Sequence, residues 1–236
     1  IIRSDVHCGY LHRGFEKECE SHTWHNLIPY VDRLNYCSAL INDFAYCDAV
    51  EQLMGIEITP RTKYLRTLLA EYSRIADHMT CIAASLMELG AMTMFLYTFR
   101  ERETLYDIFE DICGARFTVS YMRVGGVSRD YNDAWLDKVQ AFIDDFPSKW
   151  RDYDTLLTQN DIFIIRTRGV GTISRQEAID HCLTGPSLRA SGVNLDLRKS
   201  NPYLKYAEIA FDVPTHTGGD CYARYLCRMQ EMLESI

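Results

Sequence analysis

The carboxylate of Glu88 is the most unusual acidic group in the sequence. It is the only charged residue between Met79 and Phe99, a stretch of apolar and small polar residues. A lone carboxylate among apolar groups binds its proton more tightly than usual, and such a group suits proton transfer. Because this stretch also contains an expected helix end, a solvated glutamate at a helix terminus is the alternative interpretation.

Tyr36 is a second candidate, because it follows Asp32 and Arg33 in the first turn of an expected helix. A phenol at a helix N-terminus can donate a hydrogen bond to a carbonyl oxygen. The helix dipole there favours negative charge that develops on that oxygen. In a chain with 15 tyrosines, a half-buried core tyrosine is the alternative.

Histidine and cysteine could also supply metal ligands. Four histidines lie in the first 25 residues, and His22 and His25 are spaced to share one helical face, so they predict either two metal ligands or a polar surface helix. The nine cysteines include no C-x-x-C pair, which argues against a zinc ribbon or a cluster-binding loop. Their odd number and scatter predict buried, unpaired thiols in a reducing compartment. No phosphate-binding glycine loop and no nucleophile elbow are present.

The composition is that of an ordinary globular protein. The chain has 236 residues, 47% of them hydrophobic and 25% charged, and a net charge of −8. These values exclude a disordered or collagen-like chain, and an acidic chain without basic runs is not expected to bind nucleic acid. It begins at Ile1 and ends within a helical pattern, so we interpret it as a fragment whose C-terminal part is missing. We expect residues 1–20 to be the remnant of a strand-containing N-terminal region and residues 21–236 to form one helical body.

Apolar residues recur at three- and four-residue intervals and predict that this body is mainly α-helical. Thr59-Pro60, a capping hydroxyl followed by proline, predicts a long bundle helix that ends at Gly90. Other helices are expected from Asp32 to about Leu53 with Gly55 as the stop, from Thr93 to Ile112 with Gly114 as the stop, from Trp135 to Pro147, from there to about Thr158, after the Ser174–Glu177 capping box, and from Asp220 onward. Gly125-Gly126 predicts a turn, and residues 207–213 predict a short strand.

The apolar stretch around Glu88 is not expected to cross a membrane. It contains several small polar residues and is interrupted by Gly90, whereas a spanning helix needs about 20 predominantly apolar residues. A buried helix end, a turn and a buried helix start fit better.

Several segments together resemble one known family. They are residues 7–17 (HCGYLHRGFEK), 32–36 (DRLNY), 89–93 (LGAMT), 99–103 (FRERE), 123–127 (RVGGV), 188–192 (LRASG), 196–199 (DLRK), 211–214 (FDVP) and 219–220 (GD). Their order and spacing resemble the D-subunit family of respiratory complex I, the NADH:quinone oxidoreductase. This family is related to the large subunit of [NiFe]-hydrogenases, and the resemblance implies a helical bundle of that type.

The resemblance also implies roles for particular residues. Tyr36 matches the tyrosine that hydrogen bonds to a quinone carbonyl, and its partner histidine lies upstream of this chain. Glu88 stands where the family usually has an aspartate that pairs with this histidine. Arg13, Arg33 and His12 match positions that face the terminal [4Fe–4S] cluster of the adjacent B subunit. Thr118 replaces a histidine that many members carry near that cluster.

The implied activity is quinone reduction within a proton-translocating, multisubunit complex. The chain itself is expected to bind no cofactor, with NAD and the Fe–S clusters held by other subunits. The expected partners are the B, C and membrane-embedded H subunits, and the expected location is the cytoplasmic face of a bacterial inner membrane or the mitochondrial matrix face.

Three alternatives remain open at the level of sequence. The first is a nickel-binding hydrogenase large subunit, which would require a second cysteine near Cys37. The second is a non-catalytic helical scaffold, in which Tyr36 and Glu88 would tolerate mutation. The third is the same subunit in a quinone reductase that is fed by another electron donor.

Overall fold

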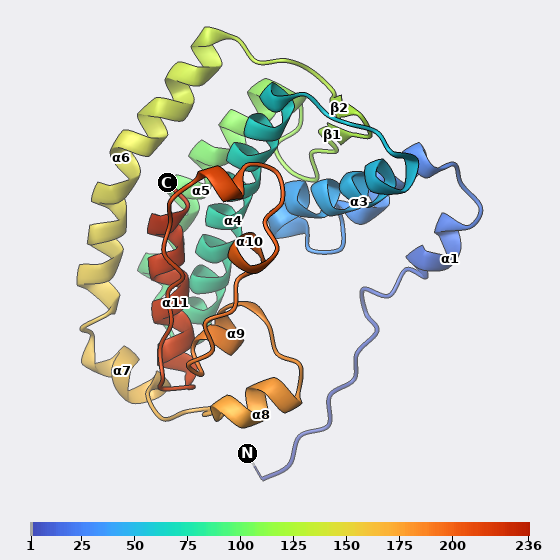
Figure 1. Ribbon diagram of the computed structural model, residues 1–236. Coiled ribbons are helices and arrows are strands. Elements are labelled where there is room, and N and C mark those ends of the chain that lie inside the picture. The colour runs from blue at the N-terminus through green and yellow to red at the C-terminus, as the bar shows by residue number, and fades with distance from the viewer. Residues whose placement is uncertain (1) are drawn as a thin grey trace.

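A bundle of long helices forms the body of the protein. The computed structural model describes residues 2–236, and Figure 1 shows helix α4 at the centre with α5, α6 and α11 around it and α3 lying crosswise beside it. The α-helices are α1 (Phe15–Cys19), α2 (Ile28–Val31), α3 (Ala39–Met54), α4 (Pro60–Glu88), α5 (Met92–Cys113), α6 (Asp133–Leu157), α7 (Asp161–Thr167), α8 (Arg175–Asp180), α9 (Gly185–Arg189), α10 (Leu197–Ser200) and α11 (Cys221–Glu234). Three short 3₁₀ turns cover Trp24–Leu27, Tyr36–Ser38 and Tyr206–Glu208. The mainly α-helical fold class is therefore confirmed.

The hydrophobic core runs along α4. Leu69, Ile75 and Met79 of this helix are completely buried, and Ile75 and Met79 share one face because they are four residues apart. Facing helices complete the core with side chains such as Leu105 and Phe146. A single continuous core of this kind makes α4 the rigid axis on which the remaining elements are placed.

Local signals predicted most of the helix ends correctly. The Thr59 hydroxyl accepts a hydrogen bond from the backbone N–H of Thr62, Ser174 forms the expected capping box with Glu177, and Asp220 caps α11. Helix α3 stops at Gly55 and α5 stops at Gly114, and both glycines adopt the left-handed conformation. The apolar stretch around Gly90 forms the turn between α4 and α5, as expected.

The only strand pair within residues 2–236 is a small antiparallel hairpin. It joins β1 (Met122–Arg123) to β2 (Gly126–Val127) around the turn expected at Gly125-Gly126. The guanidinium of Arg66 on α4 donates hydrogen bonds of 2.8 Å to the carbonyl oxygens of Arg123 and Gly126. The same guanidinium forms a buried ion pair with Glu51 on α3. The hairpin is thus fixed to both helices.

Three predicted elements are wrong. Asp32 does not begin a helix: it is buried directly after α2, and α3 starts only at Ala39. Pro147 does not end a helix, because α6 continues through it, with Phe146 and Tyr153 buried on either side. Residues 207–213 form no strand, since the segment has no neighbouring strand to complete a hydrogen-bonded ladder.

The N-terminal segment extends away from the bundle (Figure 1). Residues 2–12 are exposed, and residues 2–20 contain the short helix α1 but no strand. The expectation of a strand in this segment is therefore not met within the described residues, because nothing lies alongside the exposed chain to pair with it.

Two further expectations concern membranes and thiols. Within residues 2–236, no helix has both the length and the apolar character needed to cross a bilayer. All nine cysteines are unpaired. Cys47 and Cys227 are buried as expected, whereas Cys8 and Cys182 are exposed because they lie outside the bundle core.

Candidate functional site

Four of the predicted site residues line a single cleft. This cleft has a volume of about 450 Å³ and lies between the α1 region and the segment that joins α2 to α3. One wall contains His12 and Arg13, and the other contains Arg33 and Tyr36. The remaining lining residues are Leu11, Gly14, Phe15, Glu16 and Leu34. Residues to which the family resemblance assigns two separate roles therefore line the same cleft.

Tyr36 presents a partly exposed phenol to this cleft. The residue is 44% exposed, and its ring packs edge-on against Phe117 at a centroid distance of 5.7 Å. It lies in the 3₁₀ turn that precedes α3, as Asn35 is anchored by hydrogen bonds to Ser38 and to Asp77 of α4. Packing thus fixes the ring, while its hydroxyl forms no hydrogen bond to any residue in the range 2–236. Such a phenol is free to donate to a bound carbonyl oxygen.

The two arginines make the cleft electropositive on both walls. Arg13 donates a hydrogen bond to the carbonyl oxygen of Tyr30, and Arg33 donates one of 2.6 Å to that of Pro29. These contacts anchor each guanidinium to the backbone around α2 but use only part of its hydrogen-bonding capacity. Glu16 is the single acidic residue in the lining. The excess positive charge favours an anion or a carbonyl compound that becomes anionic on reduction.

His12 completes this wall with a defined tautomer. Its Nδ1 accepts a hydrogen bond of 3.1 Å from the backbone N–H of Gly14. The neutral ring must therefore carry its proton on Nε2, which remains available as a donor. Gly14 adopts a left-handed conformation (φ 59°) that begins α1 and forms this local turn.

Glu88 does not belong to this cleft. It is the last residue of α4 and is exposed, whereas the loop that carries Tyr36 contacts the same helix near Asp77. Eleven residues of helix separate Asp77 from Glu88, which corresponds to about 16 Å along the axis. The apolar surroundings expected around Glu88 are absent in this chain, because the surface that surrounds it is open to solvent.

Neither Thr118 nor the early histidine pair forms a ligand site. The Thr118 hydroxyl donates to the carbonyl oxygen of Phe117, and its backbone has a positive φ of 51°. His22 shares a hydrogen bond with the hydroxyl of Tyr30, and His25 packs edge-on against Trp24. Within residues 2–236, no group of three or more His, Cys, Asp or Glu side chains is placed to hold a metal ion.

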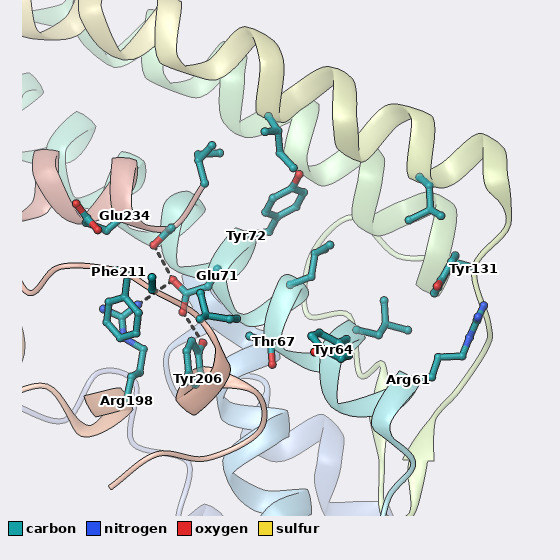
Figure 2. Close-up of a pocket in the computed structure, with 18 of the residues that line it drawn as sticks. Arg61, Tyr64, Thr67, Glu71, Tyr72, Tyr131, Arg198, Tyr206, Phe211 and Glu234 are labelled. Atoms are coloured by element: carbon teal, nitrogen blue, oxygen red, sulfur yellow. Dashed lines mark hydrogen bonds and ion pairs between the residues drawn. The ribbon is translucent and has the colours of Figure 1, made fainter. Parts of the chain in front are cut away.

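A larger cavity lies elsewhere, between α4, α6 and the end of α11. Its volume is about 600 Å³, and it contains none of the predicted site residues. Figure 2 shows Glu71 as the polar centre of this cavity, with Arg198 and Tyr206 directed toward its carboxylate. The Ser235 hydroxyl and the Arg74 guanidinium also donate to Glu71. Four donors already satisfy this carboxylate, and most of the other lining residues are apolar or aromatic.

Sequence reasoning missed a buried carboxyl pair beside the cleft. Asp32 and Asp43 are both completely buried, although the sequence pattern predicts only a helix cap at Asp32 and nothing particular at Asp43. Asp32 directly precedes Arg33, so the pair lies immediately behind one wall of the cleft. The position of Asp43 beside Phe44 and one turn after Leu40, two apolar residues of the expected helix, is the signal that could have identified it.

Together, the bundle and the cleft define a mainly helical protein with a basic, tyrosine-containing cleft. Residues 88–236 match the family model described as respiratory-chain NADH dehydrogenase, 49 Kd subunit, and the chain belongs to this family. The cleft itself lies N-terminal to the matched residues, but the similarity of individual relatives extends over it.

Those relatives are bacterial. The chain is 52% identical over all 236 residues to the D subunit of the NADH-quinone oxidoreductase of Pelobacter propionicus and covers 59% of that protein. It is 50% identical over 235 residues to the corresponding D 2 subunit of Thermodesulfovibrio yellowstonii, covering 58% of it. It is 48% identical over 236 residues to the C/D subunit of Bdellovibrio bacteriovorus, covering 42% of it. The chain thus spans about three fifths of the length of the D-subunit relatives.

Proposed function

We propose that this chain forms the quinone headgroup site of an NADH:quinone oxidoreductase and accepts electrons from a terminal [4Fe–4S] cluster in the neighbouring B subunit. The observation that carries the proposal is the meeting of Tyr36, Arg33, Arg13 and His12 in one cleft. Family membership and the names of the relatives supply the reaction. We further infer that the bundle is of the [NiFe]-hydrogenase large-subunit type.

The reaction adds two electrons and two protons to a quinone and gives a quinol. In the proposed site, the Tyr36 phenol donates a hydrogen bond to one quinone carbonyl oxygen. Negative charge that develops on this oxygen is stabilised by the donor and by the positive potential of Arg13 and Arg33. The second carbonyl is assigned to the histidine that precedes this chain in the family.

Glu88 is proposed to act on that histidine rather than on the quinone. Its carboxylate is exposed at the end of α4, so it is accessible to a segment that packs there in the longer protein. A carboxylate beside an imidazole stabilises the protonated ring, and this would help to supply the second proton.

The arginines and His12 are proposed to lie on the side of the electron donor. A positive charge near an iron–sulfur cluster favours the reduced cluster electrostatically and so raises its potential. This chain would bind no cofactor itself, and NAD and the clusters would be held by partner subunits.

We propose the B, C and membrane-embedded H subunits as its neighbours. The name of the Bdellovibrio relative, a C/D subunit, favours contact with a C subunit. The N-terminal segment supports a subunit interface, because it exposes large apolar side chains that include Ile2, Val6 and Tyr10. The proposed location is peripheral, on the cytoplasmic face of a bacterial inner membrane or on the matrix face in mitochondria.

The direct test is Tyr36→Phe in the intact complex. The loss of one hydrogen bond to a charge-developing oxygen is expected to slow quinone reduction by about 10- to 100-fold. NADH oxidation by an artificial acceptor that bypasses the quinone site should be unchanged. Tyr97→Phe is the matched control, because Tyr97 is 40% exposed on α5 and outside the cleft. Unchanged quinone reduction in Tyr36→Phe would leave only a scaffold role for the cleft.

A further inference from the structure

Two aspartates behind the cleft are buried, and neither accepts a hydrogen bond from an arginine or lysine side chain in the described part of the chain. Asp32 follows α2, Asp43 lies on α3, and both side chains have no exposed surface. Asp32 Oδ2 accepts a hydrogen bond from the Ser120 hydroxyl, and Asp43 Oδ2 accepts one of 3.1 Å from the backbone N–H of Tyr121. The pair therefore joins α2, α3 and the segment that leads into β1.

The two carboxyl groups lie close together, because their donors are the adjacent residues Ser120 and Tyr121. Neither Asp32 Oδ1 nor Asp43 Oδ1 has a donor among residues 2–236, and a hydrogen bond between the two side chains would give both oxygens a partner. Two ionised carboxylates cannot form such a bond, because neither has a hydrogen to donate. One proton shared between them satisfies both oxygens and removes one of two repelling charges.

The groups that surround the pair do not remove the need for this proton. The Arg33 guanidinium is 3.9 Å from Asp32 Oδ2, and Arg123 on β1 is directed to the carbonyl oxygens of Ser120 and Met122. The thiols of Cys47 and Cys113 are the other titratable groups nearby. Burial raises the pKa of both thiols, that of Cys47 to about 12, so both are neutral at physiological pH.

The titration of Asp43 agrees with this geometry. Burial, followed by the hydrogen bond and the charge of Asp32, raises the pKa of Asp43 to about 10. The Tyr121 N–H and the charge of Arg123 act in the opposite direction but do not outweigh burial. Asp43 accordingly keeps its proton at neutral pH and loses it only in alkali.

We propose that Asp32 and Asp43 form a buried acid pair that holds one proton and positions the Arg33 guanidinium in the cleft. With one proton present, Arg33 interacts with a single negative charge and remains anchored to the Pro29 carbonyl oxygen. Loss of the proton to water doubles the charge behind Arg33 and attracts its guanidinium toward Asp32, away from the cleft. Asp32 and Asp43 are thus positioning residues, and the effect on quinone rests on the function proposed above.

The first arm of the test is infrared spectroscopy of the intact complex, which does not depend on quinone binding. The difference spectrum between the natural complex and Asp43→Asn should contain the C=O stretching band of a protonated carboxylic acid at neutral pH. This band should disappear from the difference spectrum in strong alkali. Absence of the band at neutral pH would overturn the proposal, even if Tyr36 proves essential.

The second arm is the pH dependence of the KM for quinone. In the natural complex, KM should rise by about tenfold as the pair loses its proton, the effect of displacing one nearby charge in a partly buried site. Asp43→Asn cannot lose this proton and should flatten the rise. Asp48→Asn, five residues along the same helix and partly exposed, should keep it. An unflattened rise in Asp43→Asn would overturn the link between the pair and Arg33.

A conservative variant covers the case in which Asp43→Asn fails to assemble. Asp43→Glu keeps a titratable acid with a longer reach and should shift both the carboxylic band and the alkaline rise in KM. Unaltered positions of both would contradict a role for this side chain.

Discussion

At the scale of single residues, the site depends on side chains that are fixed by their neighbours but only partly satisfied. The Tyr36 ring is held by Phe117, and the guanidinium groups of Arg13 and Arg33 are anchored to backbone oxygens. Each of them keeps hydrogen-bonding capacity for a ligand. This combination of rigidity and unused donors is what separates them from Glu71, whose oxygens are fully occupied.

Glu88 gives a residue-scale prediction that separates function from stability. Because the side chain is exposed, Glu88→Gln should change the free energy of unfolding by no more than about 0.5 kcal/mol. If the carboxylate pairs with the proposed histidine, quinone reduction should fall by about fivefold, the effect of about 1 kcal/mol. Steady-state kinetics and thermal unfolding of the intact complex measure the two quantities.

Glu88→Asp provides the comparison, since it keeps the charge and shortens the side chain. Quinone reduction that is equal in all three proteins would exclude a role for this carboxylate. A large loss of thermal stability in Glu88→Gln would show instead that the residue is structural.

At the scale of elements, the most specific stability predictions concern the hairpin and α6. Arg66 and Glu51 form two hydrogen bonds of 2.9 and 2.7 Å in the interior, and Glu51 also accepts one from the Gly125 N–H. Removing one partner leaves a buried charge unpaired. Glu51→Gln should therefore lower the free energy of unfolding by about 3 kcal/mol, as measured by thermal denaturation of the complex.

A surface pair provides the control for this prediction. Arg61 and Asp130 form an ion pair of 3.1 Å in which both side chains are largely exposed. Asp130→Asn should change the stability by less than about 1 kcal/mol. Similar losses in both variants would contradict the view that burial makes the Arg66–Glu51 pair important.

Pro147 tests why α6 continues beyond its expected end. Proline removes one backbone N–H and crowds the preceding turn, and in a helix interior it costs about 3 kcal/mol relative to alanine. Helix α6 tolerates it because the turns on both sides are packed, with Trp150 Nε1 donating a 2.7 Å hydrogen bond to the Met229 carbonyl oxygen. Pro147→Ala should raise the thermal midpoint, whereas a lower midpoint would show that the proline geometry is needed for packing.

The distinction between local and tertiary information explains which elements the sequence could predict. Caps such as Thr59 and Asp220 act within three residues, and their positions were predicted correctly. Asp32 was wrongly assigned as a cap because its partners, Ser120 and Asp43, lie far away in the sequence. The continuation through Pro147 depends in the same way on distant packing.

The candidate site follows the same rule. Periodicity could not bring His12 and Arg13 next to Arg33 and Tyr36, because α1, a 3₁₀ turn and α2 lie between them. The family resemblance supplied this grouping, and the cleft is consistent with it. The acid pair was missed because the burial of two carboxyl groups is a property of the folded chain.

At the scale of the whole molecule, a buried polar network joins three helices of the body. Glu231 on α11 interacts with His78 Nε2 on α4 at 2.8 Å and accepts a hydrogen bond of 2.7 Å from Arg189 on α9. Burial, aided by the charges of Arg74 and Arg228, holds the pKa of His78 below its usual 6.5, despite its contact with Glu231. The neutral ring then donates from Nε2, and its Nδ1 has no partner within residues 2–236.

This network predicts acid lability. The unfolded chain protonates His78 as the pH falls below 6.5, whereas the folded chain resists it, so stability decreases in that direction. The hydrogen bond from His78, together with the charge and hydrogen bond of Arg189, overcomes burial and lowers the pKa of Glu231, which adds a loss at more acidic pH. His78→Gln should reduce the fall in thermal midpoint between pH 7 and about 5. His181→Gln, which replaces an exposed histidine, should leave it unchanged, and equal slopes in both variants would contradict the assignment.

The central claim is that quinone binds in the cleft formed by residues 11–16 and 33–36. The most direct measurement is photochemical cross-linking of the intact complex with a photoreactive quinone analogue, followed by mapping of the modified peptides. Adducts are expected in these two segments and should be suppressed by excess unmodified quinone. Suppressible adducts confined to the cavity between α4 and α6, or to other subunits, would contradict it.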